Sequence, residues 1–171
     1  MPKLSIVVPC YNEEETIPLF YPAVEKVVKQ MPVETEYWFV NDGSSDDTLA
    51  KLRKLHAQDP ERVHYVSFSR NFGKEAGLYS GLQAATGDYV VVMDADLQDP
   101  PEYLPEMYKD ISTGEYDCVG MRRTDRKGEA KFKSFLSNQF YNVINKISDT
   151  KIVSGARDYR MMTRQMVDAV L

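Results

Sequence analysis

Short apolar runs alternate along this chain with longer stretches in which apolar residues recur every three or four positions. Residues 4–9 barely alternate between apolar and polar side chains, which is typical of a strand buried on both faces. Similar runs predict further strands at residues 37–40, 63–68, 89–93 and 116–121. Helical periodicity separates these strands, so the sequence predicts an α/β fold with a mostly parallel sheet and helices on both faces.

Helix boundaries are marked by polar residues, glycine and proline. We expect helices to begin near Asn12, near Ser45 or Asp46, at Lys74 and near Thr163. Asn12 with Glu15 is typical of a capping box, and Pro18 indicates that the first helix is interrupted or restarts there. Gly87 is expected to end the helix over residues 74–85, in the position that follows the cap residue.

The composition changes at residue 122. Residues 122–133 contain six basic and two acidic side chains, and residues 132–147 carry apolar side chains at helical spacing. We expect a core over residues 1–121 and, in the same domain, a region over residues 122–171 with a basic segment and an amphipathic helix. The apolar stripe of that helix fits packing against the core as well as it fits a membrane surface.

Charge and cysteine content exclude some classes of protein. The 171-residue chain has a net charge of −5, which argues against a nucleic-acid-binding protein. Cys10 and Cys118 lie in predicted strands without metal-ligand spacing, so we expect both to be buried, unreactive thiols in a reducing compartment. No signal peptide is visible, and no apolar run approaches the roughly 20 residues that span a bilayer. We therefore expect this chain to be soluble.

Polar clusters follow the carboxyl ends of four predicted strands. These clusters are residues 11–13, 41–43, 70–74 and 94–96. Ligands of open parallel sheets bind in the crevice outside these strand ends. We therefore expect the four clusters to form one site.

Asp94 and Asp96 provide two carboxylates at the end of the strand over residues 89–93. Carboxylate oxygens are suitable ligands for Mg²⁺ or Mn²⁺, and a diphosphate can fill the remaining positions. An isolated Asp-x-Asp is more often a solvated acidic turn. Here the aliphatic strand before it and the segment Leu97-Gln98-Asp99-Pro100 after it favour a metal site.

The other clusters supply groups that suit a nucleotide. Asp42, at the end of a buried strand, can accept the ring N–H of uracil or guanine, although aspartate is also common here as a turn or cap residue. Tyr11 can stack on the base or simply pack beside the sheet. Arg70 and Lys74 flank the start of a helix, where cations and backbone N–H groups bind phosphate oxygens, but each alone is also typical of a surface charge.

The four clusters together resemble family 2 glycosyltransferases of the GT-A fold, whose sheet is Rossmann-like. The resemblance is carried by Val8-Pro9-Cys10-Tyr11-Asn12-Glu13, Val40-Asn41-Asp42-Gly43-Ser44-Ser45-Asp46, Arg70-Asn71-Phe72-Gly73-Lys74 and Met93-Asp94-Ala95-Asp96-Leu97-Gln98-Asp99-Pro100. The order and spacing resemble most the branch of dolichol-phosphate mannosyltransferases and bactoprenol, or undecaprenyl-phosphate, glucosyltransferases. The resemblance covers essentially the whole chain.

The resemblance implies roles for individual residues. It places the nucleotide at Pro9, Tyr11, Asn12, Glu13, Asp42, Gly43, Lys74 and Asp94, and a metal ion at Asp94 and Asp96. The catalytic residues would be Asp96, Gln98 and Asp158, with Gln98 near the donor sugar. Asp158 and Arg160 match the Asp and Arg of this branch's Gly-Asp-Phe-Arg segment, but Arg157 stands where that segment has glycine.

Members of this branch use lipid-phosphate acceptors and continue into transmembrane helices. The resemblance therefore implies that C-terminal membrane helices are missing from this chain, and that the whole protein acts at the cytoplasmic face of the membrane. Arg122 and Arg123 directly follow the strand predicted over residues 116–121. We expect both, together with Arg160, to contact the acceptor phosphate near the membrane surface.

The activity implied by the resemblance is an inverting transfer of a hexose from a nucleotide diphosphate sugar to a polyprenyl phosphate. The resemblance favours UDP-glucose over a GDP-sugar as the donor. A lipid monophosphate is already largely ionised near pH 7, so a strong base is not required. Two alternatives stay open: a family 2 transferase acting on a sugar hydroxyl in polysaccharide synthesis, and a non-catalytic nucleotide-sugar binding module. The sequence determines neither the sugar nor the oligomeric state, and a homo-oligomer is compatible with it.

Overall fold

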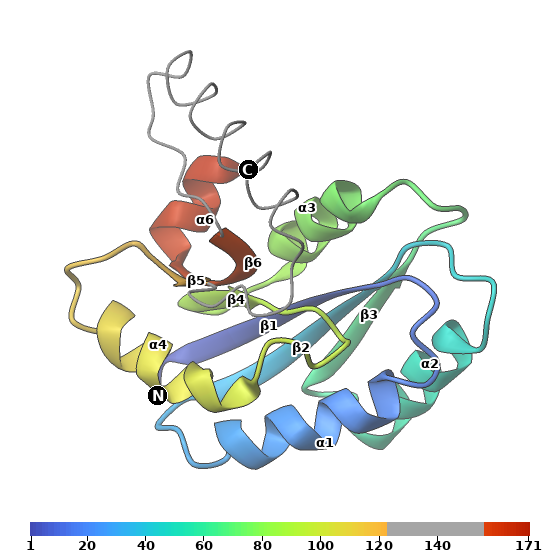
Figure 1. Cartoon of the computed structure of the whole chain (residues 1–171), viewed down its shortest axis with the longest axis horizontal. Coiled ribbons are helices and arrows are strands. Elements are labelled where there is room, and N and C mark those ends of the chain that lie inside the picture. The colour runs from blue at the N-terminus through green and yellow to red at the C-terminus, as the bar shows by residue number, and fades with distance from the viewer. Residues whose placement is uncertain (123–155) are drawn as a thin grey trace, which may run out of the picture. The chain divides into compact units, whose positions relative to one another are not determined.

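Figure 1 shows a computed structural model of the chain, which describes residues 1–122 and 156–171. The chain divides into two units, one formed by Met1–Val119 with Asp158–Leu171 and the other by Gly120–Arg157. Nearly all described residues belong to the first unit. The amphipathic helix predicted over residues 132–147 lies outside the described residues, and the division of the chain at residue 121 stays a prediction.

Within the described residues, a six-stranded sheet forms the centre of the fold. Its strands are β1 (Lys3–Cys10), β2 (Glu34–Asn41), β3 (Val63–Ser67), β4 (Tyr89–Val92), β5 (Cys118–Arg122) and β6 (Ala156–Thr163). They lie in the order β3-β2-β1-β4-β6-β5. β1 pairs in parallel with β2 and β4, β2 pairs in parallel with β3, and β4 pairs antiparallel with β6. The prediction of a mostly parallel sheet is confirmed.

Helices cover both faces of the sheet, as the sequence predicts. They are α1 (Ile17–Val28), α2 (Thr48–Gln58), α3 (Lys74–Ala84), the 3₁₀ helix η1 (Pro101–Tyr103), α4 (Leu104–Ile111) and α6 (Arg164–Val170). Leu82 of α3 and Val167 of α6 join Val7 of β1 in one hydrophobic cluster. α1 lies on the opposite face from α3 (Figure 1), and its Phe20 ring meets the ring of Phe39 edge-on, with 6.2 Å between the centroids.

The central strand β1 is enclosed by both helical layers. Its residues 4–8 are completely buried. Successive side chains of a strand point to opposite faces of the sheet, so the side chains of β1 pack alternately against the two helical layers. This explains why the sequence of β1 is a nearly continuous apolar run.

Strand β6 is not predicted from the sequence. Tyr159 and Met161 are buried and alternate with the charged Asp158 and Arg160, but this strand signal covers only a few residues. Pairing with β4, in which Val92 lies opposite Arg160, fixes the strand. The antiparallel addition brings Asp158 to the carboxyl end of β4, where the polar clusters gather.

The first helix begins at Ile17, later than the start predicted at Asn12. Asn12 has a positive φ of 57° and belongs to a loop contact: its N–H donates to Ser44 Oγ (2.9 Å) and its Oδ1 accepts the N–H of Ser45 (2.9 Å). The capping-box prediction is therefore wrong, because Asn12 holds a neighbouring loop instead of a helix end. Pro18 lies in the first turn of α1, in agreement with the predicted restart.

Helix α3 does not end in a glycine cap. The chain leaves α3 through Ala85 in an extended conformation (φ −62°, ψ 133°), so the role predicted for Gly87 is wrong. Gly87 instead lies against β1, where a Cβ would be 2.7 Å from both the carbonyl oxygen of Lys3 and Oγ of Ser5. Close backbone approach, not a left-handed turn, requires glycine at this position.

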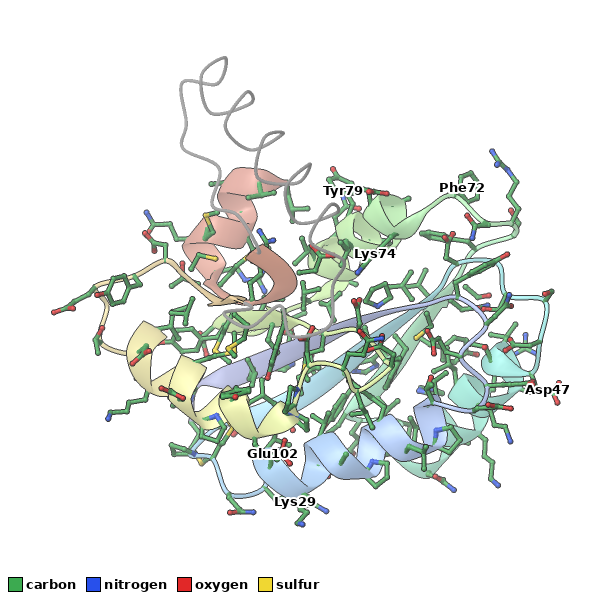
Figure 2. All side chains as sticks on the ribbon, viewed as in Figure 1. Lys29, Asp47, Phe72, Lys74, Tyr79 and Glu102 are labelled. Atoms are coloured by element: carbon green, nitrogen blue, oxygen red, sulfur yellow. The ribbon has the colours of Figure 1, made fainter. Side chains whose placement is uncertain are left out.

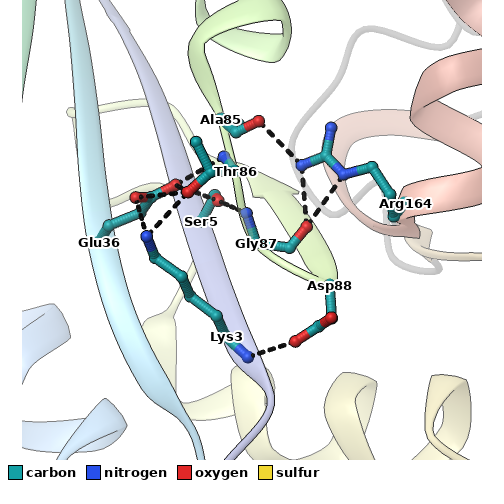
Figure 3. Close-up of polar contacts among 8 residues, drawn as sticks. All are labelled: Lys3, Ser5, Glu36, Ala85, Thr86, Gly87, Asp88 and Arg164. Atoms are coloured by element: carbon teal, nitrogen blue, oxygen red, sulfur yellow. Dashed lines mark hydrogen bonds and ion pairs between the residues drawn. The ribbon is translucent and has the colours of Figure 1, made fainter.

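A buried carboxylate anchors the connection between α3 and β4 (Figure 3). The side chain of Glu36 accepts hydrogen bonds from the hydroxyl of Ser5 (2.6 Å) and the backbone N–H of Thr86 (2.7 Å) and forms an ion pair with Lys3 (2.5 Å). Arg164 donates to the carbonyl oxygens of the same connection and so attaches α6 to it. This network fixes the amino-terminal end of the sheet, opposite the predicted site.

The two cysteines differ in their surroundings. Cys10 is buried, and burial raises the pKa of its thiol well above the ordinary value. Cys118 is exposed because β5 is an edge strand, so the prediction that both cysteines are buried is wrong for Cys118. Among the helices in the described part of the chain, none has the length and apolar character needed to cross a membrane.

Candidate active site

A cleft of about 430 Å³ lies at the carboxyl ends of β1, β2 and β4. Its lining residues are Pro9, Cys10, Tyr11, Glu13, Asp42, Asn71, Gly73, Lys74, Gly77, Asp94, Ala95 and Asp96. All four polar clusters singled out in the sequence contribute to this lining. The parallel strands bring these clusters together because their carboxyl ends share one edge of the sheet.

Asp42 shapes one wall of the cleft. It is almost completely buried, and its two carboxylate oxygens accept the backbone N–H groups of Phe72 (2.7 Å) and Gly73 (2.9 Å). Each oxygen keeps a second lone pair that a base N–H can use. The observed partners nevertheless show that Asp42 holds the loop over residues 70–73, which leads directly into α3.

Gly43 and Arg70 take part in this wall without lining the cleft. Gly43 packs directly against the backbone of Arg70 and Asn71. The guanidinium carbon of Arg70 lies 4.1 Å from the centroid of the Phe72 ring, and both side chains are exposed. In this structure Arg70 therefore stacks on an aromatic ring of its own loop.

Glu13 and Asn12 connect the segment after β1 to the start of α2. Glu13 lines the cleft, its N–H donates to Thr48 Oγ1 (2.7 Å), and its carboxylate accepts the hydroxyl of Thr16. Asn12 is not among the lining residues, and its amide oxygen accepts the N–H of Ser45. Of these two residues, only Glu13 is placed to contact a ligand directly.

Lys74 is the first residue of α3 (Figure 2), and its ammonium group lies between two carboxylates. Its Nζ is 2.8 Å from Oδ1 and 2.9 Å from Oδ2 of Asp94, and 2.8 Å from Oδ2 of Asp158. Arg160 lies on the other side of Asp158, with 3.7 Å between Nη2 and Oδ1. Asp158, which the sequence places far from the other candidates, is thus brought to the edge of the cleft.

The ionisation of Lys74 and Asp158 is coupled. Partial burial opposes the charge of Lys74, but hydrogen bonds to Asp158 and Asp94 outweigh it and raise the pKa of Lys74 above its ordinary value. The hydrogen bond from Lys74 lowers the pKa of Asp158, although partial burial acts in the other direction. Both groups are therefore charged at neutral pH, and Asp158 is a weak base there.

Asp96 begins a tight turn after β4. Its Oδ1 accepts the backbone N–H of Gln98 (3.0 Å), and Leu97 between them has a positive φ of 58°. An aspartate that accepts the N–H two residues further on is typical of an Asx turn. The turn keeps Asp96 in the lining of the cleft, whereas Gln98 lies beside Asp96 and does not line the cleft itself.

Asp94 and Asp96 fit the hard oxygen ligands that Mg²⁺ and Mn²⁺ prefer. Both line the cleft, and the ammonium group of Lys74 on the two oxygens of Asp94 shows that this position stabilises a cation. Among the described residues, no group of three or more His, Cys, Asp or Glu side chains is arranged to hold a metal. An ion bound by these two carboxylates therefore needs further oxygen ligands, which a diphosphate and water can supply.

The residues predicted to contact an acceptor phosphate are only partly placed. Arg160 lies on β6 beside Asp158. Arg122 ends β5, but its side chain lies outside the description, and Arg123 lies outside the described residues altogether.

The sequence does not single out Gly77, which lines the cleft. Gly77 and Gly81 lie one turn apart on α3, and a Cβ at position 81 would be 2.4 Å from Cγ1 of Val7. Glycine therefore lets α3 pack closely on β1. Two glycines four positions apart in a helical pattern are the signal that could have identified this surface.

Comparisons with known proteins identify the family of the chain. The family described as glycosyl transferase family 2 matches residues 5–171. The bactoprenol glucosyl transferase of Shigella phage SfX is 42% identical over 168 residues, which are 98% of this chain and 54% of that relative. The chain thus spans about half the length of the curated relatives it matches.

Solved structures share the fold. Residues 1–349 of TarS from S. aureus, in complex with UDP-GlcNAc, are 25% identical with a TM-score of 0.58, over 75% of this chain and 36% of that one. The mannosyltransferase PcManGT from Pyrobaculum calidifontis, in complex with GDP-Man and Mn²⁺, is 23% identical with a TM-score of 0.64, over 99% of this chain and 46% of that one. These similarities confirm the predicted GT-A fold. With a family match over nearly its whole length, the chain belongs to glycosyl transferase family 2.

Proposed function

We propose that this chain is the catalytic domain of a metal-dependent, inverting glycosyltransferase that moves a hexose from UDP-sugar to a polyprenyl phosphate. The observation that carries the proposal is the meeting of Asp42, Lys74, Asp94 and Asp96 in one cleft, with Asp158 at its edge. Support for the acceptor comes from the relative named bactoprenol glucosyl transferase.

The donor nucleotide occupies the cleft beside β1 and β2 in this proposal. Tyr11 is half exposed and available to stack on the base, and Pro9 and Glu13 line the same part of the cleft. Asp42 accepts the N–H of the base with its remaining lone pairs while it holds the loop over residues 70–73. UDP is preferred to GDP in this proposal because the curated relative is named a glucosyl transferase and the TarS structure, 25% identical, contains UDP-GlcNAc.

Asp94 and Asp96 bind the diphosphate through Mg²⁺ or Mn²⁺ in this proposal. The bound ion supplies Lewis-acid stabilisation of the charge that develops on the departing diphosphate. Asp96 is oriented for this task by its turn with Gln98, whose nearness to the donor sugar is implied by the family resemblance alone. Gln98 acts as a positioning residue for Asp96.

The acceptor approaches from the side of β6. An oxygen of the lipid phosphate attacks the anomeric carbon, the bond from that carbon to the diphosphate oxygen breaks, and the nucleoside diphosphate leaves with the electron pair. Arg160 is placed to attract the acceptor phosphate, and Asp158 orients Arg160 and Lys74. Arg122 and Arg123 contact the acceptor phosphate in this proposal, in which residues 1–121 form the core and residues 122–171 form the acceptor region.

The whole protein is proposed to act at the cytoplasmic face of a membrane. The acceptor suggested by the relative's name is a lipid, and nucleotide sugars are found in the cytoplasm. The relatives are about twice as long as this chain, which leaves room for a membrane-bound part.

Isothermal titration of UDP and GDP, with Mn²⁺ and then with EDTA, tests the donor site. We expect metal-dependent binding of UDP that is lost in Asp96→Ala and kept in Asp47→Ala, since Asp47 is exposed and makes no cap hydrogen bond with its side chain. Folded protein that binds neither nucleotide in the presence of Mn²⁺ would contradict the proposal. Transfer to a polyprenyl phosphate, compared with transfer to a soluble sugar hydroxyl, then tests the acceptor.

A further inference from the structure

Asp94 lies two residues after the end of β4, and Asp158 lies in β6, the antiparallel neighbour of β4. The pairing of β4 with β6 places Val92 opposite Arg160 and Val91 opposite Met161. Continuing this register past the end of β4 by two residues places Asp94 opposite Asp158. Like charges directly opposite each other in a sheet repel.

Lys74 compensates this repulsion in the structure. Its ammonium group lies within 2.9 Å of both oxygens of Asp94 and 2.8 Å from Asp158. An ammonium group bound to both oxygens of a carboxylate occupies the place of a second cation and repels it by its positive charge. A metal ion that binds Asp94 therefore competes with Lys74.

The position of Lys74 is fixed by the loop before it. Gly73, the residue before α3, donates its N–H to Asp42, as does Phe72. The side chain of Lys74 also lines the cleft in which the diphosphate is proposed to lie. Lys74 can thus exchange a carboxylate partner for a phosphate partner through side-chain rotation alone, while α3 stays in place.

We propose that Lys74 is a positioning residue that occupies the cation position on Asp94 while the donor is absent and releases Asp94 when the diphosphate arrives. This inference rests on the proposed function. In the free protein, Lys74 holds Asp94 and Asp158 together and suppresses binding of a divalent ion. When the diphosphate binds, it takes over Lys74, and Asp94 becomes available to the metal. Lys74 thereby couples metal binding to donor binding and keeps Asp158 at the edge of the cleft.

Binding of Mn²⁺ in the absence of nucleotide tests this role, because activity is not needed for the readout. Free Mn²⁺ is followed by electron paramagnetic resonance during titration of the wild type, Lys74→Met and Lys74→Gln. We expect both neutral variants to bind Mn²⁺ about tenfold more tightly than the wild type, within the usual range of coupling between sites. Lys74→Arg keeps the charge and should bind Mn²⁺ as the wild type does. Lys54→Met, on α2 outside the cleft, serves as the control.

The same titration with saturating UDP separates the two proposals. In the wild type, UDP should strengthen Mn²⁺ binding more than it does in Lys74→Met, because only the wild type has to displace Lys74. Unchanged Mn²⁺ affinity in both neutral variants, with Mn²⁺ and UDP still binding together, would overturn the role of Lys74 alone. If the wild type binds no Mn²⁺ even with UDP, the proposed metal-dependent donor site itself is wrong.

Discussion

The α-carbon of Gly43 lies so close to the backbone of Arg70 that a Cβ at position 43 would be 2.2 Å from the carbonyl carbon of Arg70. Gly43 also has a φ of +64°, in the left-handed region. Two separate requirements, close approach and a left-handed backbone, therefore select glycine after Asp42. The contact presses the loop that leads to Lys74 against the end of β2.

Replacing Gly43 by alanine should displace the loop over residues 70–73. We expect Gly43→Ala to weaken UDP binding with Mn²⁺ at least about tenfold, or ~1.4 kcal/mol, because Asn71, Gly73 and Lys74 line the cleft. Isothermal titration measures the binding, and urea unfolding measures the stability.

Gly114→Ala provides a matched control for this prediction. Gly114 also has a positive φ, +78°, but no atom lies within 4 Å of the Cβ that would be added. Gly114→Ala should therefore lower the free energy of unfolding only by the cost of alanine in the left-handed region, about 1–2 kcal/mol. It should bind UDP normally. Equal losses of stability in Gly43→Ala and Gly114→Ala, with normal UDP binding in both, would show that the contact with Arg70 is unimportant.

Asp42→Asn should destabilise the protein as well as the donor site. An asparagine side chain has one acceptor oxygen instead of two, so the N–H of either Phe72 or Gly73 loses its partner. An unsatisfied buried donor costs about 1–3 kcal/mol in the free energy of unfolding, and we expect the lower end of this range because both N–H groups are only partly buried. Asp47→Asn, at an exposed position just before α2, should change the stability by less than about 0.5 kcal/mol. If Asp42 served only to bind the base, UDP affinity would fall while urea unfolding stayed that of the wild type.

Glu36 should make the stability depend on pH in the acidic range. Burial raises the pKa of this carboxyl, but hydrogen bonds from Lys3, Ser5 and Thr86 outweigh burial and lower the pKa from 4.5 to about 2. The ionised form is favoured in the folded state, so its contribution is complete above pH 4.5 and is lost as the pH falls toward 2. Because Lys3 is partly exposed and screened by solvent, we expect a contribution on the order of 2 kcal/mol.

Urea unfolding at several pH values between 6 and 2 measures this contribution as the difference between the wild type and Glu36→Gln. The variant should be less stable than the wild type at pH 6, and the difference should shrink as the pH approaches 2. Glu102→Gln, at an exposed position in η1, should follow the wild type throughout. A constant difference between wild type and Glu36→Gln over the whole range would refute the role of the ionised carboxylate.

The sheet and the donor side of the site could be predicted because they depend on local patterns. The apolar run of β1 and the polar residues after β1, β2 and β4 sit on strands whose parallel arrangement follows from the alternation with helices. Any such arrangement brings Tyr11, Asp42 and Asp94 to one edge. No information on distant contacts was needed.

The acceptor side could not be predicted in the same way because it depends on contacts between distant parts of the sequence. β6 pairs antiparallel with β4, and only this register brings Asp158 to Lys74. The hydrogen-bond partners of Asp42 and Asn12 also come from loops that are distant in the sequence. From the sequence alone, an aspartate or asparagine at these positions could equally be a helix cap or a ligand-binding residue. Cys118 was misplaced because an apolar run does not show that its strand lies at the edge.

Asp158→Asn should reduce the rate of transfer to a polyprenyl phosphate only about tenfold, which corresponds to ~1.4 kcal/mol. The acceptor phosphate is already ionised near pH 7, and the contact with Lys74 lowers the pKa of Asp158, so a proton need not pass to this carboxylate. The loss should arise because Lys74 and Arg160 no longer share a charged partner. The measurement compares kcat of the variant and of Asp168→Asn, whose exposed side chain pairs with Arg164 on α6. A loss of about 10³-fold or more, with donor binding intact, would instead identify Asp158 as a general base and would favour a sugar hydroxyl as the acceptor.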